Sequence, residues 1–304
     1  IGVAKMPLKT VAILSPGDMG HAVGRALREG GLNVITCLQG RSERTGRLAQ
    51  QAGIKDVPSL EELVSKADLV LSIMVPAEAV SLARQVAKAL GDSGSNTYFA
   101  DCNAISPQTT KEIEGIITKA GGRYIDASIV GSPPGKGRPP RFYTSGEHCH
   151  VMSEMDGMSI SVRPLGDEIG RASGIKMCYA GLTKGTSALH IAVLSAAEAM
   201  GLSEELRAEF SSSQPHALQQ MESGISRLPS RAFRWIGEME EIAATYDHLG
   251  VTPHFHKGAA EVYRLLSETS FASEKAESVD TNRTTAQTIK ATVGLLHSHA
   301  DKSS

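Results

Sequence analysis

The chain has few aromatic residues, no excess of either charge and no long apolar run. Phenylalanine, tryptophan and tyrosine make up 4% of its 304 residues, too few for a surface on which nucleic-acid bases stack. Lysine and arginine number 31, and aspartate and glutamate 33, so the net charge favours neither nucleic acid nor an anionic membrane as a partner. No apolar run approaches the roughly 18 residues of a membrane-spanning helix. We therefore predict neither a nucleic-acid nor a membrane partner.

Cysteine is scarce and scattered as well. Cys37, Cys102, Cys149 and Cys178 show no C-x-x-C spacing, which predicts buried thiols of a reducing compartment rather than disulfides or a zinc site. Six histidines form three pairs, each with one residue between its two members, namely His148/His150, His254/His256 and His297/His299. We assign them no cysteine or carboxylate partners at ligand spacing and predict no metal. With no signal peptide visible, we expect a cytoplasmic protein, with Met6 as native start and residues 1–5 as an added remnant.

The strongest positive signal lies in residues 9–42. An apolar run at 10–14 enters the turn Ser15-Pro16-Gly17-Asp18-Met19-Gly20, followed by small residues at helical spacing and a second apolar run at 32–38. Strand, turn, helix and strand within about thirty residues form one βαβ unit, whose turn directs backbone N–H groups at a pyrophosphate. Serine replaces the first glycine of G-x-G-x-x-G, but the two later glycines remain. We predict a dinucleotide site at residues 15–20; the alternative is a similar unit that binds nothing.

The end of the second apolar run indicates which dinucleotide binds. An NAD site usually carries Asp or Glu there, bonded to the ribose 2′-hydroxyl. Here the sequence continues as Gln39-Gly40-Arg41-Ser42-Glu43-Arg44, with no acid at the strand tip. A guanidinium binds a 2′-phosphate with paired hydrogen bonds, whereas a carboxylate repels it. We predict NADP(H), held by Gln39, Arg41, Ser42 and Arg44; the alternative is that both arginines are solvated loop charges.

The pattern along the chain predicts two domains. Repeated strand–helix units favour a doubly wound, mostly parallel sheet, with strands at 11–14, 34–38, 68–75, 98–101 and 123–129 and shorter ones at 142–144, 159–162 and 175–179. Ser59 with Glu62 and Ser106 with Pro107 are helix-start signals. Helical patterns then occupy 182–200, 204–210, 215–225, 230–249, 253–269 and 281–296. We expect an α/β Rossmann domain at residues 7–181, followed by an all-α domain at 182–304.

Several short motifs follow one another in a characteristic order. After SPGDMG at 15–20 come QGRS at 39–42, Val75-Pro76, Asp101-Cys102-Asn103, DASIVGS at 126–132 and GLTKG at 181–185. In this order the chain resembles the β-hydroxyacid dehydrogenase superfamily, which includes 6-phosphogluconate dehydrogenase and the imine reductases. It looks closest to the 6-phosphogluconate dehydrogenase-like branch whose C-terminal domain has no known function.

The resemblance implies roles for individual residues. Val75 and Pro76 would line the cofactor, and Asn103 would contact the nicotinamide ribose or the substrate, or serve as a plain turn residue. Ser128, Gly131 and Ser132 would line the substrate pocket. Lys184 takes the place of the catalytic lysine, a general base in oxidation and a general acid in carbonyl reduction, because a desolvated lysine exchanges its proton more readily.

Two departures leave the substrate open. Many relatives carry Asn four residues after the lysine, where this chain has Ala188, so Ser187 is the nearby polar replacement on that helix face. The Ser-Gly-Gly turn that often touches a substrate carboxylate reads Val-Gly-Ser. A basic loop with Lys136, Arg138 and Arg141 either attracts an anionic substrate or is simply solvated.

The resemblance also implies a homodimer formed through the α-domain. Trp235 and Met239 recur at helical spacing and are either core residues or cover the substrate from a partner subunit. The predicted function is an NADPH-dependent oxidoreductase acting on a small hydroxy or keto substrate. The alternatives are an imine reductase on the same scaffold and a non-catalytic NADP-binding protein.

Overall fold

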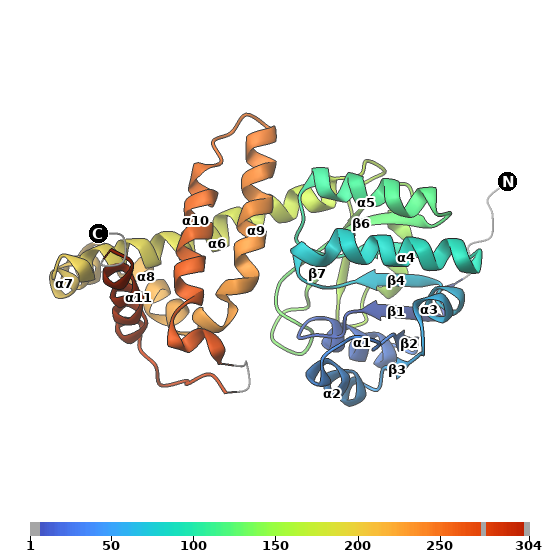
Figure 1. Cartoon of the computed structure of the whole chain (residues 1–304), viewed down its shortest axis with the longest axis horizontal. Coiled ribbons are helices and arrows are strands. Elements are labelled where there is room, and N and C mark those ends of the chain that lie inside the picture. The colour runs from blue at the N-terminus through green and yellow to red at the C-terminus, as the bar shows by residue number, and fades with distance from the viewer. Residues whose placement is uncertain (1–6, 275–277, 301–304) are drawn as a thin grey trace. The chain divides into compact units, whose positions relative to one another are not determined.

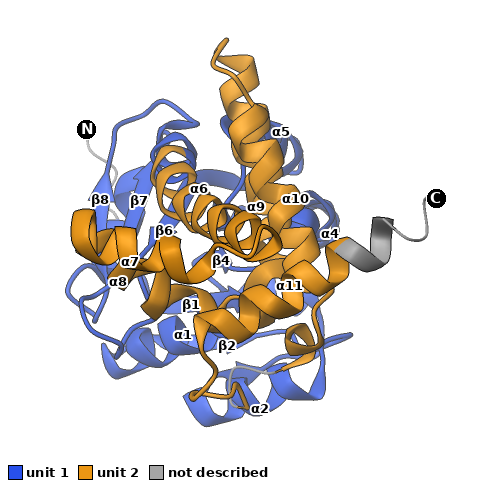
Figure 2. Cartoon of the chain, turned by 90° about the vertical axis from the view of Figure 1, so that its left-hand side faces the viewer, with its two compact units in different colours: residues 1–177 blue, residues 178–304 orange. Residues whose placement is uncertain are grey.

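The computed structural model (Figure 1) describes residues 7–274 and 278–300, without the side chains of 297–300. Met6, the residues before it, and the His297/His299 side chains therefore lie outside the described part. The chain divides into two compact units, residues 1–177 and 178–304 (Figure 2). The division falls inside helix α6 (Arg171–Ala199), whereas the sequence predicted a domain boundary after residue 181.

Unit 1 is built on one mixed sheet, which has eight strands within the described residues. These are β1 (Thr10–Leu14), β2 (Asn33–Thr36), β3 (Lys55–Asp56), β4 (Leu69–Ser72), β5 (Tyr98–Asp101), β6 (Arg123–Val130), β7 (Arg141–Ser145) and β8 (Ser161–Pro164). They lie in the order β3-β2-β1-β4-β5-β6-β7-β8, and only β6 and β7 pair antiparallel. The strand order therefore reverses between β1 and β4, the point at which open α/β sheets bind ligands.

Both faces of this sheet are covered. Successive side chains point to opposite faces, so Val11 and Ile13 enter one apolar layer and Ala12 and Leu14 the other. The first layer contains α1 (Gly20–Glu29) and α2 (Glu43–Ala52), and the second α3 (Leu60–Lys66), α4 (Ala79–Ser93) and α5 (Pro107–Lys119). Burial on both faces explains why the strands read as continuous apolar runs. The predicted doubly wound fold is confirmed.

Serine side chains begin three of the unit 1 helices. The Ser59 hydroxyl accepts a hydrogen bond from the Glu62 backbone N at 3.2 Å, and Ser106 accepts one from Thr109 N at 3.1 Å. Both helix starts predicted from the sequence are thus confirmed. Ser42 begins α2 in the same way, accepting from Thr45 N at 3.3 Å; no helix was predicted at that place.

The strand predicted at 175–179 is wrong, because these residues belong to α6. A short apolar run fits a buried strand or a buried helix equally well, and here a distant carboxylate decides. The buried Asp126 Oδ2 accepts hydrogen bonds from the backbone N of Gly170 at 2.9 Å and of Ala172 at 3.1 Å, and a negative charge stabilises a helix N-terminus. Lys184 therefore lies well inside a helix, and not at the helix start that the sequence indicated.

Unit 2 is all α, as predicted. Besides the rest of α6, its described elements are α7 (Ser203–Ser213), α8 (Pro215–Gly224), η3 (Ile225–Arg227), α9 (Pro229–His248), α10 (His254–Ser267), η4 (Ser270–Ser273) and α11 (Thr285–Ala300). Helices α9 and α10 pack together around Met239, Ile242 and Tyr263, each fully buried. Among the described residues, no helix is both long enough and apolar enough to cross a membrane.

Candidate functional site

The predicted cofactor residues meet at one edge of the sheet. Strands β1, β2, β4, β5 and β6 run parallel, so the loops after them lie at their common carboxyl edge. Those loops and the first residues of the helices after them hold residues 15–20, residues 39–44, Val75 with Pro76, Asn103, and Gly131 with Ser132. Ser15 N donates to Ile73 O at 3.3 Å, and Ile73 N donates to Leu14 O. The loops after β1 and β4 are thereby joined where the strand order reverses.

Two glycines of the loop after β1 have different roles. A Cβ on Gly20 would lie 2.3 Å from the carbonyl oxygen of Ser15, so only glycine lets α1 begin this close to β1. A Cβ on Gly17 would meet nothing within 4 Å, so the space beside this backbone is open. The first turn of α1 has no acidic residue, and no side-chain hydrogen bond caps it. Such a helix N-terminus suits a phosphate group.

An ion pair connects this loop to α2. Asp18 is the only acidic residue of residues 15–20, and its Oδ1 lies 2.6 Å from Arg44 Nη2, with both side chains about a third exposed. Arg44 therefore offsets the negative charge beside the helix N-terminus. The structure thus brings together two residues that the sequence assigned separately to the cofactor.

The turn after β2 remains basic in three dimensions. Arg41 is half-buried in a turn closed by its own N–H, which donates to Leu38 O at 2.9 Å, and Gln39 and Ser42 are exposed. The Ser42 hydroxyl, which begins α2, remains at the protein surface. Asp56 on β3 brings a carboxylate near this turn, where its Oδ1 accepts from Leu38 N at 2.9 Å.

Asn103 holds the sheet edge together. It is 2% exposed; its Oδ1 accepts from Met74 N at 2.6 Å, and its Nδ2 donates to Ser72 Oγ at 2.9 Å and to Asp101 Oδ2 at 3.0 Å. Both amide protons are therefore used within the protein, and only one lone pair of Oδ1 is left for a ligand. This geometry favours the turn-residue reading of Asn103 over direct contact with substrate.

The residues predicted to line the substrate pocket after β6 divide into two kinds. Ser128 is fully buried and donates its Oγ proton to Ala172 O at 2.7 Å, so it fixes the start of α6 and does not line a pocket. Gly131 has a positive φ of 123°, a value that disfavours other residues, and Ser132 is exposed. Lys136 and Arg138 in the following loop are exposed as well.

In unit 2, Lys184 lies in a small polar cluster between α6, α9 and α10. Its ammonium group pairs with Glu238, and the two side chains are only 15% and 13% exposed. The Nζ atom also lies 4.8 Å from the centre of the Trp235 ring. Tyr263 donates its hydroxyl proton to the Lys184 carbonyl at 2.6 Å and meets Trp235 edge to face, with ring centres 5.2 Å apart. Carboxylate and ring both stabilise the ammonium form.

Ser187 belongs to the same cluster, one turn further along α6. Its hydroxyl donates to Thr183 O at 3.1 Å and also interacts with Tyr263. Burial raises the pKa of Tyr263 well above its usual range, so this phenol stays protonated at neutral pH. Ala188 is buried. Met239 is fully buried too, which makes it a core residue and not one that covers a substrate.

Comparison with known families agrees with this geometry. Residues 10–152 match the NAD-binding domain of 6-phosphogluconate dehydrogenase, and residues 197–266 match DUF1932, a domain of unknown function. The chain therefore combines a domain similar to the NAD-binding domain of 6-phosphogluconate dehydrogenase with a DUF1932 domain. 3-Hydroxyacid dehydrogenases and imine reductases are among the structural neighbours, and the chain shares their fold.

Four relatives illustrate the likeness. An uncharacterised 28.5 kDa protein of Methanothermus fervidus is 28% identical over 175 residues, which are 58% of this chain and 66%, less than two thirds, of that protein. A solved protein of unknown function, described as similar to 3-hydroxyacid dehydrogenases, is 28% identical with a TM-score of 0.62, covering 85% of this chain and 97% of the other. The fold is shared by the 3-hydroxyisobutyrate dehydrogenase of Mycobacterium tuberculosis, which is 18% identical with a TM-score of 0.64 over 96% of this chain and 99% of the other. It is also shared by an imine reductase of Bacillus cereus, which is 18% identical with a TM-score of 0.53 over 84% of this chain and 92% of the other.

Unit 2 has two features that the sequence did not reveal. Glu238 and Tyr263 reach Lys184 only because α9 and α10 pack on α6, and no local spacing signals that. Helices α6 and α10 also line an apolar pocket of about 620 Å³, together with Tyr246 of α9. Leu182, Leu189 and Phe255 line it and are 72%, 61% and 78% exposed.

Proposed function

We propose that the protein is an NADPH-dependent oxidoreductase that transfers hydride between nicotinamide and a small hydroxy or keto substrate. One observation carries the proposal: an uncapped helix N-terminus at the β1/β4 reversal point, beside a basic turn after β2. The α1 N-terminus and Gly17 suit the pyrophosphate, and Arg41, Ser42 and Arg44 suit the 2′-phosphate. When bound, the nicotinamide supplies or accepts the hydride.

Lys184 is the proposed proton donor and acceptor of this reaction. In carbonyl reduction its ammonium group would give a proton to the substrate oxygen, and in oxidation the amine would remove the hydroxyl proton. Glu238 and the Trp235 ring hold the ammonium group in position, and Glu238 stabilises its charge within a largely buried cluster. This arrangement suits proton donation in reduction, and by microscopic reversibility the same group accepts the proton in oxidation.

Cofactor preference is tested by binding titrations with NADPH and NADH. An Arg41→Ala variant should bind NADPH about 10- to 100-fold more weakly, because one charged hydrogen-bonding group contributes about 1.5–3 kcal/mol, and NADH with unchanged affinity. Arg47→Ala is the matched control, since Arg47 lies in α2, the helix that follows the turn of Arg41, and pairs with Glu43 in solvent. Equal affinity of the native protein for both cofactors would contradict the proposal.

The role of Lys184 is tested by turnover at saturating NADPH. Lys184→Met should lower kcat by about 10²- to 10⁴-fold, the usual contribution of a general acid, with NADPH affinity unchanged. Lys257→Met, which removes an exposed lysine from α10, should leave turnover at the native level. Near-native turnover of Lys184→Met would remove the lysine from the mechanism.

Two other functions are separated by the same assays. An imine reductase, whose fold this chain shares, would reduce cyclic imines faster than the matching ketones and depend less on Lys184. A non-catalytic NADP-binding protein would bind NADPH tightly and exchange hydride with no carbonyl or imine substrate. Paired ketone and imine panels therefore decide among the three.

A homodimer formed through unit 2 is part of the proposal. Leu182, Leu189 and Phe255 expose large apolar side chains around one pocket, and clustered exposure of this kind marks a protein contact. A second copy of this chain is the proposed occupant. Light scattering should give twice the chain mass, and Leu189→Asp should give a monomer; a native monomer at high concentration would contradict the dimer.

A further inference from the structure

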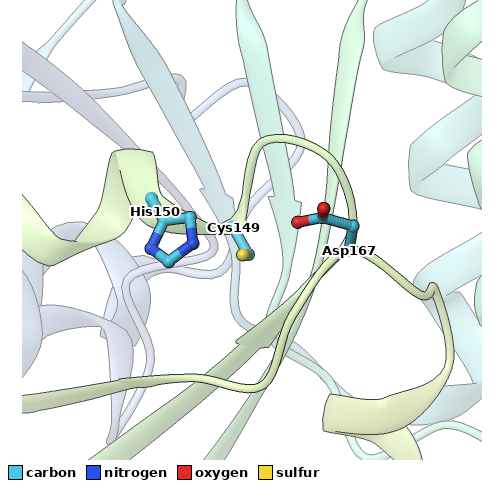
Figure 3. Close-up of side chains that lie close together, drawn as sticks. All are labelled: Cys149, His150 and Asp167. Carbon is cyan, nitrogen blue, oxygen red and sulfur yellow. The ribbon is translucent and has the colours of Figure 1, made fainter.

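Three metal-ligating side chains gather in unit 1, away from the proposed cofactor residues. Cys149 Sγ, a ring nitrogen of His150 and a carboxylate oxygen of Asp167 all lie within 4.8 Å of one another. Figure 3 shows the cysteine sulfur between the imidazole and the carboxylate. The thiol is buried, whereas His150 and Asp167 are exposed, so an ion can reach the cluster from solvent. This arrangement corrects the sequence-based view that the His148/His150 pair has no cysteine or carboxylate partner.

The backbone holds the cluster in a defined place. Cys149 begins η2 (Cys149–Met155) after β7, and Asp167 lies in the loop after β8. Strands β7 and β8 are parallel neighbours, so both loops lie at the same end of the strands. Gly146 N donates to Gly166 O at 3.0 Å, and Cys149 N donates to Gly146 O at 2.9 Å. Two chain segments distant in sequence are thus joined directly beside the three side chains.

Burial raises the pKa of the Cys149 thiol, so a bound metal ion has to displace the thiol proton. The donor set combines a soft thiolate, an imidazole and a hard carboxylate, all of which Zn²⁺ accepts.

We propose that Cys149, His150 and Asp167 form a three-ligand zinc site that fastens the loop after β8 to η2. Zinc–ligand bonds of about 2.0–2.3 Å place tetrahedral ligand atoms about 3.3–3.8 Å apart, so side-chain rotations of His150 and Asp167 close the remaining distance. Zn²⁺ replaces the thiol proton, which passes to solvent, and water fills the fourth position. The site is independent of the proposed hydride transfer.

Cobalt substitution tests the proposal on the full chain, first stripped of metal with a chelator. Co²⁺ should bind at one ion per chain and give a near-ultraviolet thiolate-to-cobalt charge-transfer band, which added Zn²⁺ then removes. Zn²⁺ should also raise the Tm of the native protein. Cys149→Ser should abolish the band. Asp167→Asn and His150→Gln should each weaken Zn²⁺ binding at least about 10-fold, measured by calorimetry.

Matched controls separate the site from adventitious binding. Cys178→Ser removes the exposed cysteine of the described chain, and His254→Gln removes an exposed histidine; both should bind like the native protein. Because Asp167 and His150 are exposed, their variants test the site even if Cys149→Ser fails to fold. Absence of the band in the native protein, or equal Zn²⁺ affinity in Asp167→Asn, His150→Gln and the native protein, would overturn the proposal.

Discussion

Replacing Gly17 and Gly20 singly by alanine separates the two requirements of the loop after β1. In Gly20→Ala the new Cβ would lie 2.3 Å from the Ser15 carbonyl oxygen and 3.1 Å from Ile13 Cγ2. Real Cβ contacts stay at or beyond 3.0 Å, so α1 or the loop must move by about 0.7 Å. Strain of this kind in a packed region costs about 1–3 kcal/mol of unfolding free energy.

Gly17→Ala should behave in the opposite way. Its Cβ would meet nothing within 4 Å, and the backbone φ lies outside the positive range that favours glycine. The unfolding free energy should therefore stay the same or rise by about 0.4–1 kcal/mol, because alanine restricts the unfolded chain. NADPH affinity should fall at least about 10-fold, since the methyl group occupies the space where the pyrophosphate approaches the backbone.

Thermal unfolding without ligand, together with NADPH titration, measures both quantities. For a protein of this size Tm falls by about 2–4 °C for each kcal/mol lost, so Gly20→Ala should melt clearly below the native protein and Gly17→Ala should not. A native Tm in Gly20→Ala would contradict the packing argument. Native NADPH affinity in Gly17→Ala would show that no phosphate approaches this loop.

Two further predictions concern stability. Asp126→Asn should lower the unfolding free energy, measured by urea titration, by about 2–4 kcal/mol. The reason is that an amide cannot accept all the hydrogen bonds that the buried carboxylate accepts from Ser145 Oγ, Ser173 Oγ and the start of α6. The control Asp156→Asn, whose carboxylate accepts one bond from Val162 N, should lower the unfolding free energy less; equal losses in the two variants would contradict the argument. Burial lowers the pKa of His256. Below about pH 6.5 the unfolded chain therefore binds more protons than the folded chain, and the unfolding free energy falls as the pH falls. His256→Gln should make the unfolding free energy less dependent on pH between about pH 8 and pH 5.5, and an unchanged slope would refute this role of His256.

Most of the order of elements in unit 1, though not α2 or β3, was predictable because these elements depend on near neighbours in sequence. Ser59 and Ser106 satisfy backbone N–H groups three residues ahead, so their signals are local. The run at 98–101 was predicted as a strand because helical patterns flank it on both sides, and β5 has those bounds. The glycine loop was readable for the same reason, since Gly20 meets Ser15 and Ile13 a few residues before it.

Predictions failed where distant residues decide. Residues 175–179 were assigned to a strand because the sequence does not reveal that Asp126, almost fifty residues earlier, binds the start of α6. Cys178 was expected to be buried and is exposed. Ser128 was expected to line the substrate pocket and is fully buried, because polarity alone does not tell which face a neighbouring element covers. Of the two alternatives for Met239, a core residue or a cover over the substrate, its burial supports the core residue.

The sequence by itself therefore determined the doubly wound domain and the helical second unit, since these follow from periodicity, helix-start signals and glycine spacing. Only the tertiary structure decided which side chains act together. Packing of α9 and α10 on α6 gives Lys184 its partners Glu238, Trp235 and Tyr263, and parallel pairing of β7 with β8 brings Asp167 to Cys149 and His150. Contacts between segments far apart in the chain are fixed by burial and strand pairing, and no local pattern encodes them.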